Sequence, residues 1–144
     1  MDHNTTATVS SYSVAQTQVL TDTVNWDSSL NARNIKADEI ATISKHPTFK
    51  IATTSDWFYL DSNSKTQTAT TQGASNYAWL YDYTNGCISY GCNTMDKSAY
   101  GYWTQDTVAG SSSYAWRVYF GGYLRDYNVS NTSNGVRPVI TIQK

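Results

Sequence analysis

The run Gly135–Ile142 is the most apolar stretch of a polar chain, and it predicts a strand close to the C-terminus. Pro138 lies inside this run. Because proline donates no backbone hydrogen bond, the strand must lie at the edge of a sheet or carry a bulge. The preceding stretch, Ser111–Asn134, is dense in Ser, Asn, Gly, Tyr, Trp and Arg. We therefore expect a regular scaffold that ends in this strand and presents the loop-rich stretch as a ligand surface.

Two other segments are expected to join this strand in one sheet. Tyr100–Thr104 and Tyr114–Phe120 are short runs rich in aromatic residues. The pair Gly121-Gly122 marks a turn that leads from the second run to Tyr123–Arg125. The sequence thus predicts an α+β fold made mostly of short strands and loops.

One helix is clear in the sequence, at about residues 37–45. Two acidic residues fill its first turn, where the helix dipole favours negative charge. Ile40 and Ile43 follow Ile35 at roughly helical spacing, which predicts one buried side. Pro47 should end the helix, because the residue before a proline avoids the α-helical region.

The whole chain is expected to consist of one domain, residues 31–144, and a lead-in before it, residues 1–30. The lead-in is rich in Thr, Ser and Asn with weak alternation, which predicts an extended N-terminal segment or an edge strand. A partly disordered stalk is the alternative. Within the domain, Ala32–Ile35 predicts a short strand, Trp57–Leu60 a buried aromatic run, and Tyr77–Tyr83 a strand or a packed turn.

Tyrosine and tryptophan must supply much of the core. A chain of 144 residues fits one domain and can bury a real core. It contains 12 Tyr, 5 Trp and 3 Phe, so most of its rings carry a polar group that needs a partner when buried. With its many Thr, Ser and Asn residues, this composition is typical of an extracytoplasmic protein.

The charge pattern argues against nucleic acid as a partner. Only 15% of the residues are charged and the net charge is −1, whereas binding driven by counterion release needs clustered Lys and Arg. No run of about 18 apolar residues occurs, so we expect no membrane span. The first residues do not resemble a signal peptide, and we expect that a leader or anchor precedes the given sequence.

No catalytic group, metal or cofactor is expected, and the protein is expected not to be an enzyme. Glu39 is the lone glutamate, the two histidines lie near the N-terminus and at a helix end, and no Gly-x-Ser-x-Gly motif occurs. Cys87 and Cys92 are the only cysteines. In an oxidising compartment they predict a short disulfide loop, whereas a zinc site would need two further ligands.

Alternation along the run 114–120 predicts the binding face. Trp116 and Val118 fall on one face, expected to be core, and Arg117 and Tyr119 on the other, expected to face solvent. Tyrosine and arginine are favoured at binding surfaces, although an ordinary wet sheet face with incidental tyrosines is the alternative. The expected ligand-binding residues are Tyr114, Arg117, Tyr119, Tyr123, Arg125, Asp126 and Tyr127.

Two further sets of polar residues are expected to be structural. Arg137 lies inside the apolar run, so it should reach back to a carboxylate or to loop carbonyls, with anion binding as the alternative. Asn128, Asn131 and Asn134 are expected to form turns.

Four motifs occur in a fixed order: Tyr-Gly-Tyr-Trp-Thr at 100–104, Ala-Trp-x-Val at 115–118, Gly-Gly at 121–122 and Asn-Gly-Val-Arg-Pro-Val at 134–139. With them, the chain over about residues 31–144 resembles a family of bacterial and phage domains with a C-type-lectin-like fold. Such domains are often found on pilin-like or other secreted proteins. The resemblance implies a C-type-lectin-like domain at a cell or virion surface.

The resemblance also implies two kinds of function. Variable proteins of diversity-generating retroelements use this architecture, and there a reverse transcriptase rewrites adenines near the C-terminus; the segment Ser111–Asn134 could be such a region. The implied function is a receptor- or adhesin-type module that binds a protein or carbohydrate on another cell or virion through residues 111–127. The alternative is a structural subunit or tip of a pilin-like assembly.

Two activities known for this fold are not expected. The calcium lectins use Glu-Pro-Asn or Gln-Pro-Asp together with Trp-Asn-Asp. None of these triplets occurs here, and Arg117 follows Trp116. Formylglycine-generating enzymes share the fold and depend on cysteines in the C-terminal part, but no cysteine lies beyond Cys92.

Overall fold

The computed structural model describes residues 11–17, 32–46, 48–51, 56–62, 76–81, 101–119, 121–131 and 134–140. This part of the chain is a mixed α+β structure with few helices and most of its regular residues in strands. Its elements are β1 (Arg33–Asn34), α2 (Ala37–Ile43), β2 (Phe58–Tyr59), the 3-10 helix η2 (Ala78–Leu80), β3 (Gly101–Thr107), β4 (Tyr114–Tyr119), β5 (Tyr123–Asn128), β6 (Asn134–Gly135) and β7 (Pro138–Val139). Residues 12–17 are also helical.

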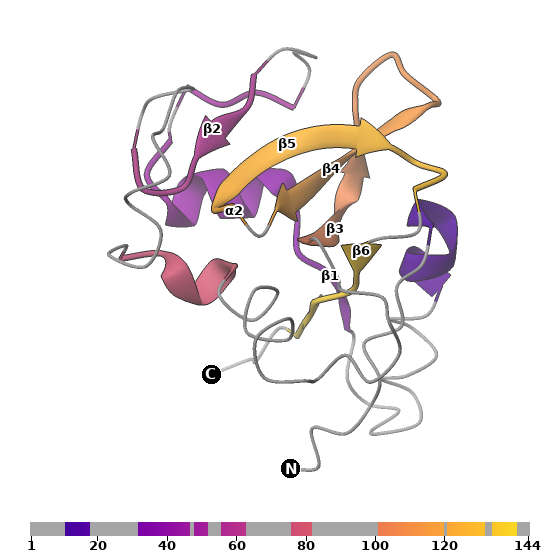
Figure 1. Cartoon of the computed structure of the whole chain (residues 1–144), viewed down its shortest axis with the longest axis horizontal. Helices are drawn as coiled ribbons and strands as arrows, with labels where there is room; N and C mark the ends of the chain where they lie inside the picture. Colours follow the sequence, from indigo (N-terminus) through magenta and orange to yellow (C-terminus); the bar gives the residue numbers. More distant parts are fainter. Residues whose placement is uncertain are drawn as a thin grey trace, which may run out of the picture.

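A five-stranded sheet in the order β2-β5-β4-β3-β6 forms the centre of the molecule, with α2 behind it (Figure 1). The strands β3, β4 and β5 are consecutive antiparallel neighbours, so the predicted strands at 100–104 and 114–120 and the run 123–125 pair as expected. Gly122 joins β4 to β5 with a φ of 80°, a backbone conformation that favours glycine. The predicted Gly121-Gly122 turn is thereby confirmed.

The predicted C-terminal strand is divided. The segment β6 pairs with β3 in parallel, whereas β7 leaves this sheet and pairs with β1 in an antiparallel, two-stranded sheet. The prediction that the whole run belongs to the sheet of β3 and β4 is therefore wrong. The physical reason lies at Pro138, which cannot donate a ladder hydrogen bond, and its predicted edge position is confirmed in a sheet of two strands.

The face of the large sheet that points toward α2 carries the main core. Trp116, Val118 and Leu124 are each fully buried there, with Ile40 from α2. Directly paired residues of two strands lie on the same side of a sheet, and the pairs Val118–Leu124 and Phe58–Leu124 all belong to this core. The assignment of Trp116 and Val118 to the core is confirmed.

The predicted helix at 37–45 is confirmed as α2, but proline does not end it. Lys45 has a φ of 60°, and its N–H donates to Thr42 while the N–H of His46 donates to Ala41. This arrangement is a Schellman motif with lysine where glycine is usual. The buried side of α2 consists of Ala37, Ile40 and Ala41, whereas Ile43 is exposed.

The described part of the lead-in is helical rather than extended, so the expected strand is wrong at residues 12–17. Ala15 is fully buried against Trp103 and Ala115, and these three residues form a second, smaller core cluster. The Tyr12 ring meets Trp103 edge-on at 5.7 Å. The sequence of this segment shows only weak alternation and no helical pattern. The residues that bury Ala15 lie in β3 and β4, which the sequence of the segment itself cannot reveal.

The remaining segments follow the sequence in part. The strand expected at 32–35 is confirmed as β1, and the segment expected at 77–83 contains the helix η2, which is a packed turn. Among the described residues, no helix is both long enough and apolar enough to span a bilayer.

Candidate ligand-binding surface

The sheet face opposite α2 carries a group of aromatic side chains that we call the tyrosine face. Its residues come from β2, β4 and β5 and from the position just before β2. Residues paired between β5 and β4, or between β5 and β2, point to the same side of the sheet. The tyrosine face consists of Trp57, Tyr59, Tyr119, Tyr123, Arg125 and Tyr127. All except the exposed Arg125 are half-buried.

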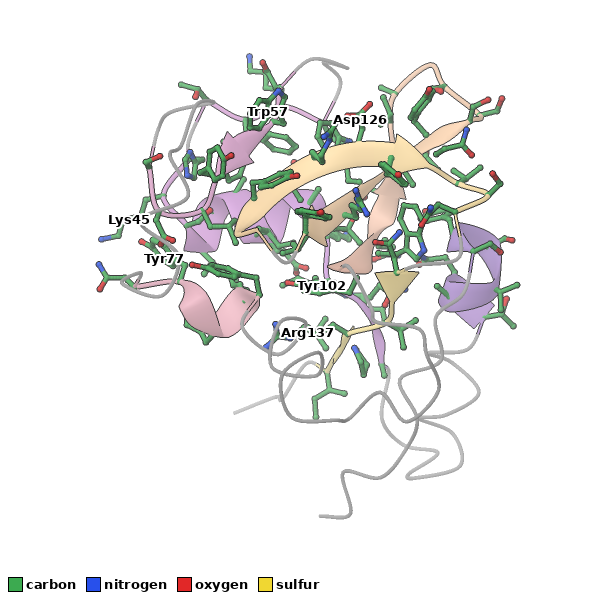
Figure 2. All side chains as sticks on the ribbon, in the orientation of Figure 1. Lys45, Trp57, Tyr77, Tyr102, Asp126 and Arg137 are labelled. Carbon is green, nitrogen blue, oxygen red and sulfur yellow. The ribbon has the colours of Figure 1, made fainter. Side chains whose placement is uncertain are left out.

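Four of the rings form a continuous group centred on Tyr123. The centroid of its ring lies 4.8 Å from that of Tyr119, 5.2 Å from that of Tyr59 and 5.8 Å from that of Trp57. Figure 2 shows Trp57 next to β2. Aromatic pairs at such distances and at tilted or edge-on angles attract each other. The group is thus fixed by its own contacts and still leaves part of each ring open to solvent.

Arg117 lies on the same side of the sheet but is buried, with 4% of its surface exposed. Its guanidinium carbon lies 3.6 Å from the centroid of the Tyr127 ring and 4.7 Å from that of Tyr119. Nη1 donates to Oδ1 of Asn134 at 2.9 Å, whereas Nε has no hydrogen-bond partner. The expectation that Arg117 faces solvent is wrong, because alternation gives the side of the strand but not what covers it.

The two arginines of this face are direct neighbours, and no described acidic side chain pairs with either of them. Arg117 pairs with Arg125 across β4 and β5. Neither forms an ion pair within the described residues. Burial lowers the pKa of the Arg117 guanidinium, and the charge of Arg125 acts in the same direction, opposed by the neighbouring tyrosines. Among the described residues, nothing compensates the positive charge of this face.

The seven predicted ligand-binding residues are divided between the two faces of the sheet. Arg117, Tyr119, Tyr123, Arg125 and Tyr127 share one face. Tyr114 and Asp126 belong to the other, since Asp126 pairs with the core residue Trp116 and Tyr114 pairs with Asn128. Tyr114 is exposed and Asp126 half-buried, at the end of the sheet beyond the main core.

Three residues of this site were not predicted from the sequence. Trp57 and Tyr59 were assigned to the core with the whole run 57–60. Only Phe58 and Leu60 of that run are buried, so its own alternation was the missed signal. Asn134 was expected to form a turn, but it is fully buried in β6, where it accepts from Arg117 and donates to Asn131.

The other polar predictions have mixed outcomes. Arg137 donates to the carbonyl oxygens of Leu80 and Trp79, both at 2.6 Å, so its structural role toward loop carbonyls is confirmed. Figure 2 shows Arg137 below Tyr102, and the guanidinium lies 5.3 Å from that ring. Asn128 accepts from the backbone of Ser130, as expected of a turn.

The stretch 111–134 is not a displayed loop over most of its length. It contains β4 and β5, which form the middle of the sheet. Half of their side chains therefore point into the core, and the available surface is one side of a hairpin. This corrects the expectation of a loop-rich surface at 111–127.

The remaining candidate groups lie elsewhere. Cys87 and Cys92 are outside the described residues. Within the described ranges, no three His, Cys, Asp or Glu side chains gather as a metal site would require. Two shallow hollows flank α2, one beside His46 and Phe49 and the other beside Arg33 and Val139. Neither hollow contains a predicted ligand-binding residue.

The comparisons with known proteins gave one family match. The model of a family described as a domain of unknown function, DUF6273, matches residues 16–144. No curated protein and no solved structure matches the chain.

Proposed function

We propose that this chain, which belongs to the DUF6273 family of domains of unknown function, is a non-catalytic binding module that holds its partner against the tyrosine face. The observation that carries the proposal is the group of half-buried rings around Tyr123, on a sheet whose other side carries the main core. Rigid amphipathic rings bury contact area at low entropic cost. A folded sheet holds them in place before the partner arrives.

We propose in addition that the domain has a C-type-lectin-like fold and is displayed at a cell or virion surface. The support is that the motifs behind this resemblance coincide with structural elements. Residues 101–104 of the first motif begin β3, and Ala-Trp-x-Val lies in β4. Gly-Gly forms the turn to β5, and the last motif covers β6 and β7.

Retroelement diversification of the segment 111–134 remains part of the proposal, in a narrower form. Trp116, Val118 and Leu124 are fully buried and Arg117 nearly so, and substitution there would disrupt packing. Variation would therefore be confined to outward positions such as Tyr119, Tyr123 and Arg125, since Tyr127 packs against Arg117 and the second core cluster. Sequencing this gene across a population tests the proposal, and variation spread evenly over inward and outward codons would contradict it.

The binding function is tested by a triple variant, Tyr119→Ala, Tyr123→Ala and Arg125→Ala. Wild type and variant would be applied to an array of neutral and acidic glycans and to a displayed random-peptide library. We expect the wild type to select members of at least one set and the variant to lose them. The variant loses the ring contacts of two half-buried tyrosines, so its melting temperature should fall, and circular dichroism would establish that the variant compared is folded.

The matched control replaces the two predicted residues of the opposite face, Tyr114→Ala with Asp126→Ala. This double variant should bind as the wild type does. Equal binding by the triple variant, or no selection by the wild type from either set, would overturn the proposal.

A further inference from the structure

We infer that the partner group held by the tyrosine face is an acidic saccharide, with its carboxylate paired to Arg125 and its ring against Tyr123 and Tyr119. This inference rests on the binding function proposed above and adds the chemical class of the ligand.

The charge of the face is the first argument. Arg117 and Arg125 lie directly opposite each other on β4 and β5, and like charges in this position repel. Arg117 is 4% exposed, so little water screens it, and its Nε has no hydrogen-bond partner. No described acidic side chain pairs with either residue. An anion bound at the exposed Arg125 would relieve this repulsion and would form charge-assisted hydrogen bonds with a planar donor that fits a carboxylate.

The chemistry of the rings is the second argument. An aromatic ring has a negative face, which attracts the polarised C–H groups on the flat side of a sugar ring. Each tyrosine also carries a hydroxyl that can donate and accept, as sugar hydroxyls do. The centroids of Tyr119 and Tyr59 lie 4.8 Å and 5.2 Å from that of Tyr123, so neighbouring rings lie side by side.

An acidic peptide is the less favoured partner. Peptides are commonly bound at open strand edges or in grooves with aliphatic anchors. The tyrosine face is the side of a sheet. β4 lies between β3 and β5, and the outer edge of β5 is paired with β2 at Tyr123 and Leu124. Among the described residues, the exposed aliphatic side chains Val14, Ile43 and Ile140 belong to other elements. What the face offers is hydroxyls, ring faces and positive charge.

The experiment measures binding to three acidic saccharides, each beside its neutral methyl ester. Polygalacturonate, hyaluronate and a sialylated oligosaccharide would be titrated into the full chain by calorimetry at low and high NaCl. We expect at least one acid to bind, its ester to bind at least about tenfold more weakly, and the affinity to fall with salt. Arg125→Gln should weaken binding of the acid about 10- to 100-fold, whereas Arg125→Lys should retain part of it.

Lys45→Gln serves as the matched control, since it removes one exposed positive charge at the end of α2 and changes the net charge equally. Its binding should equal that of the wild type. Tyr123→Ala tests the rings and should weaken binding of the acid and of its ester by a similar factor, because the rings contact the sugar and not the carboxylate. Circular dichroism of each variant would establish that the protein compared is fully folded.

The failures of the two proposals can be distinguished. Equal binding of acids and esters, lost in Tyr123→Ala, would overturn the acidic class and leave the binding face intact. Binding of poly-L-glutamate as tight as that of the best saccharide would overturn the saccharide assignment. Absence of binding to all three acids would overturn the inference, and the array and library of the preceding test would then decide the binding function. Binding indifferent to both Arg125 and Tyr123 would overturn both proposals.

Discussion

Arg117 and Arg125 share one register position, yet only Arg125 is exposed to solvent. The side chain of Arg117 fills the space between the Tyr119 and Tyr127 rings and satisfies Asn134. Truncation there leaves a cavity and an unpaired buried amide oxygen. We expect Arg117→Ala to lower the free energy of unfolding by about 2–4 kcal/mol, and Arg125→Ala to lower it by less than about 0.5 kcal/mol.

Urea unfolding of both variants measures this difference. Arg117→Met adds a second comparison, because replacing a buried cation by an apolar side chain of similar length removes its desolvation cost. The methionine variant should be more stable than the alanine variant. Equal stabilities for Arg117→Ala and Arg125→Ala would show that Arg117 is not packed as described.

His46 gives the stability a dependence on pH. It is buried, and its ring is stacked on Phe58 with the centroids 3.7 Å apart. Burial lowers the pKa of His46 below its usual value, while hydrogen bonds to the backbone of Leu60 and Tyr59 act in the opposite direction. The unfolded chain therefore takes up the proton first as the pH falls. The contribution of neutral His46 is complete above about pH 6.5 and is lost progressively below it.

Chemical unfolding between pH 7.5 and pH 5 tests this expectation. The free energy of unfolding should fall with pH in the wild type and should fall less in His46→Phe, which keeps a ring against Phe58. His3 is present in both proteins, so it does not contribute to the difference between their pH dependences. Parallel curves would contradict the assignment to His46.

The hairpin of β4 and β5 depends on a glycine whose neighbours leave no room for a side chain. A Cβ at Gly122 would lie 2.9 Å from the Tyr81 ring, whereas a Cβ at Gly110 would meet nothing within 4 Å. Both residues have positive φ, 80° and 73°. We expect Gly110→Ala to cost about 1 kcal/mol for the backbone alone, and Gly122→Ala about 1–3 kcal/mol more, because Tyr81 must move.

Thermal unfolding of the two alanine variants separates the backbone cost from the steric one. The Tyr81→Ala background provides the check, since the extra cost at Gly122 should largely disappear there. Equal melting temperatures for Gly110→Ala and Gly122→Ala would contradict the close packing of this turn.

The sequence was sufficient to predict those elements that are determined by the pattern of their own residues. The helix α2 has its acidic first turn and apolar spacing, and the hairpin has its paired glycines. The break in the C-terminal run was signalled by Pro138, but the new partner of β7 could not be inferred. That partner is β1, at the other end of the described domain.

The sequence did not show which side chains would be buried by residues that are distant in the chain. Alternation predicts an exposed Arg117. Its side chain is buried because it contacts Tyr127 in β5 and Asn134 in β6. The run 12–17 looks extended, and it is helical because Ala15 finds Trp103 and Ala115. Five of the seven predicted binding residues still share one face, since the strand and the turn were correctly placed.

In the whole molecule, residues 12–17 act as a cover for one end of the sheet. The N–H of Tyr12 donates to Val129, and the Gln16 amide donates to Thr104. Ala15 is fully buried, whereas its neighbour Val14 is 53% exposed. We expect Ala15→Asp to lower the free energy of unfolding by about 2–4 kcal/mol, because it buries an unpaired carboxylate.

Val14→Asp is the control for this substitution, and it should change the stability by less than about 0.5 kcal/mol. Equilibrium unfolding in urea, followed by tryptophan fluorescence, measures both variants. Equal effects of the two substitutions would mean that this helix does not dock on the sheet.

Two contacts join segments that are far apart in the sequence, and both affect how the chain folds. β1 pairs with β7, and Arg137 donates hydrogen bonds to the carbonyl oxygens of Trp79 and Leu80. A polypeptide is synthesised from its N-terminus, so β1 leaves the ribosome long before its partner exists. Closing such distant contacts is entropically costly and slows folding. The two-stranded sheet can therefore form only after β7 has been synthesised, so this pairing is a late step in the folding of the chain.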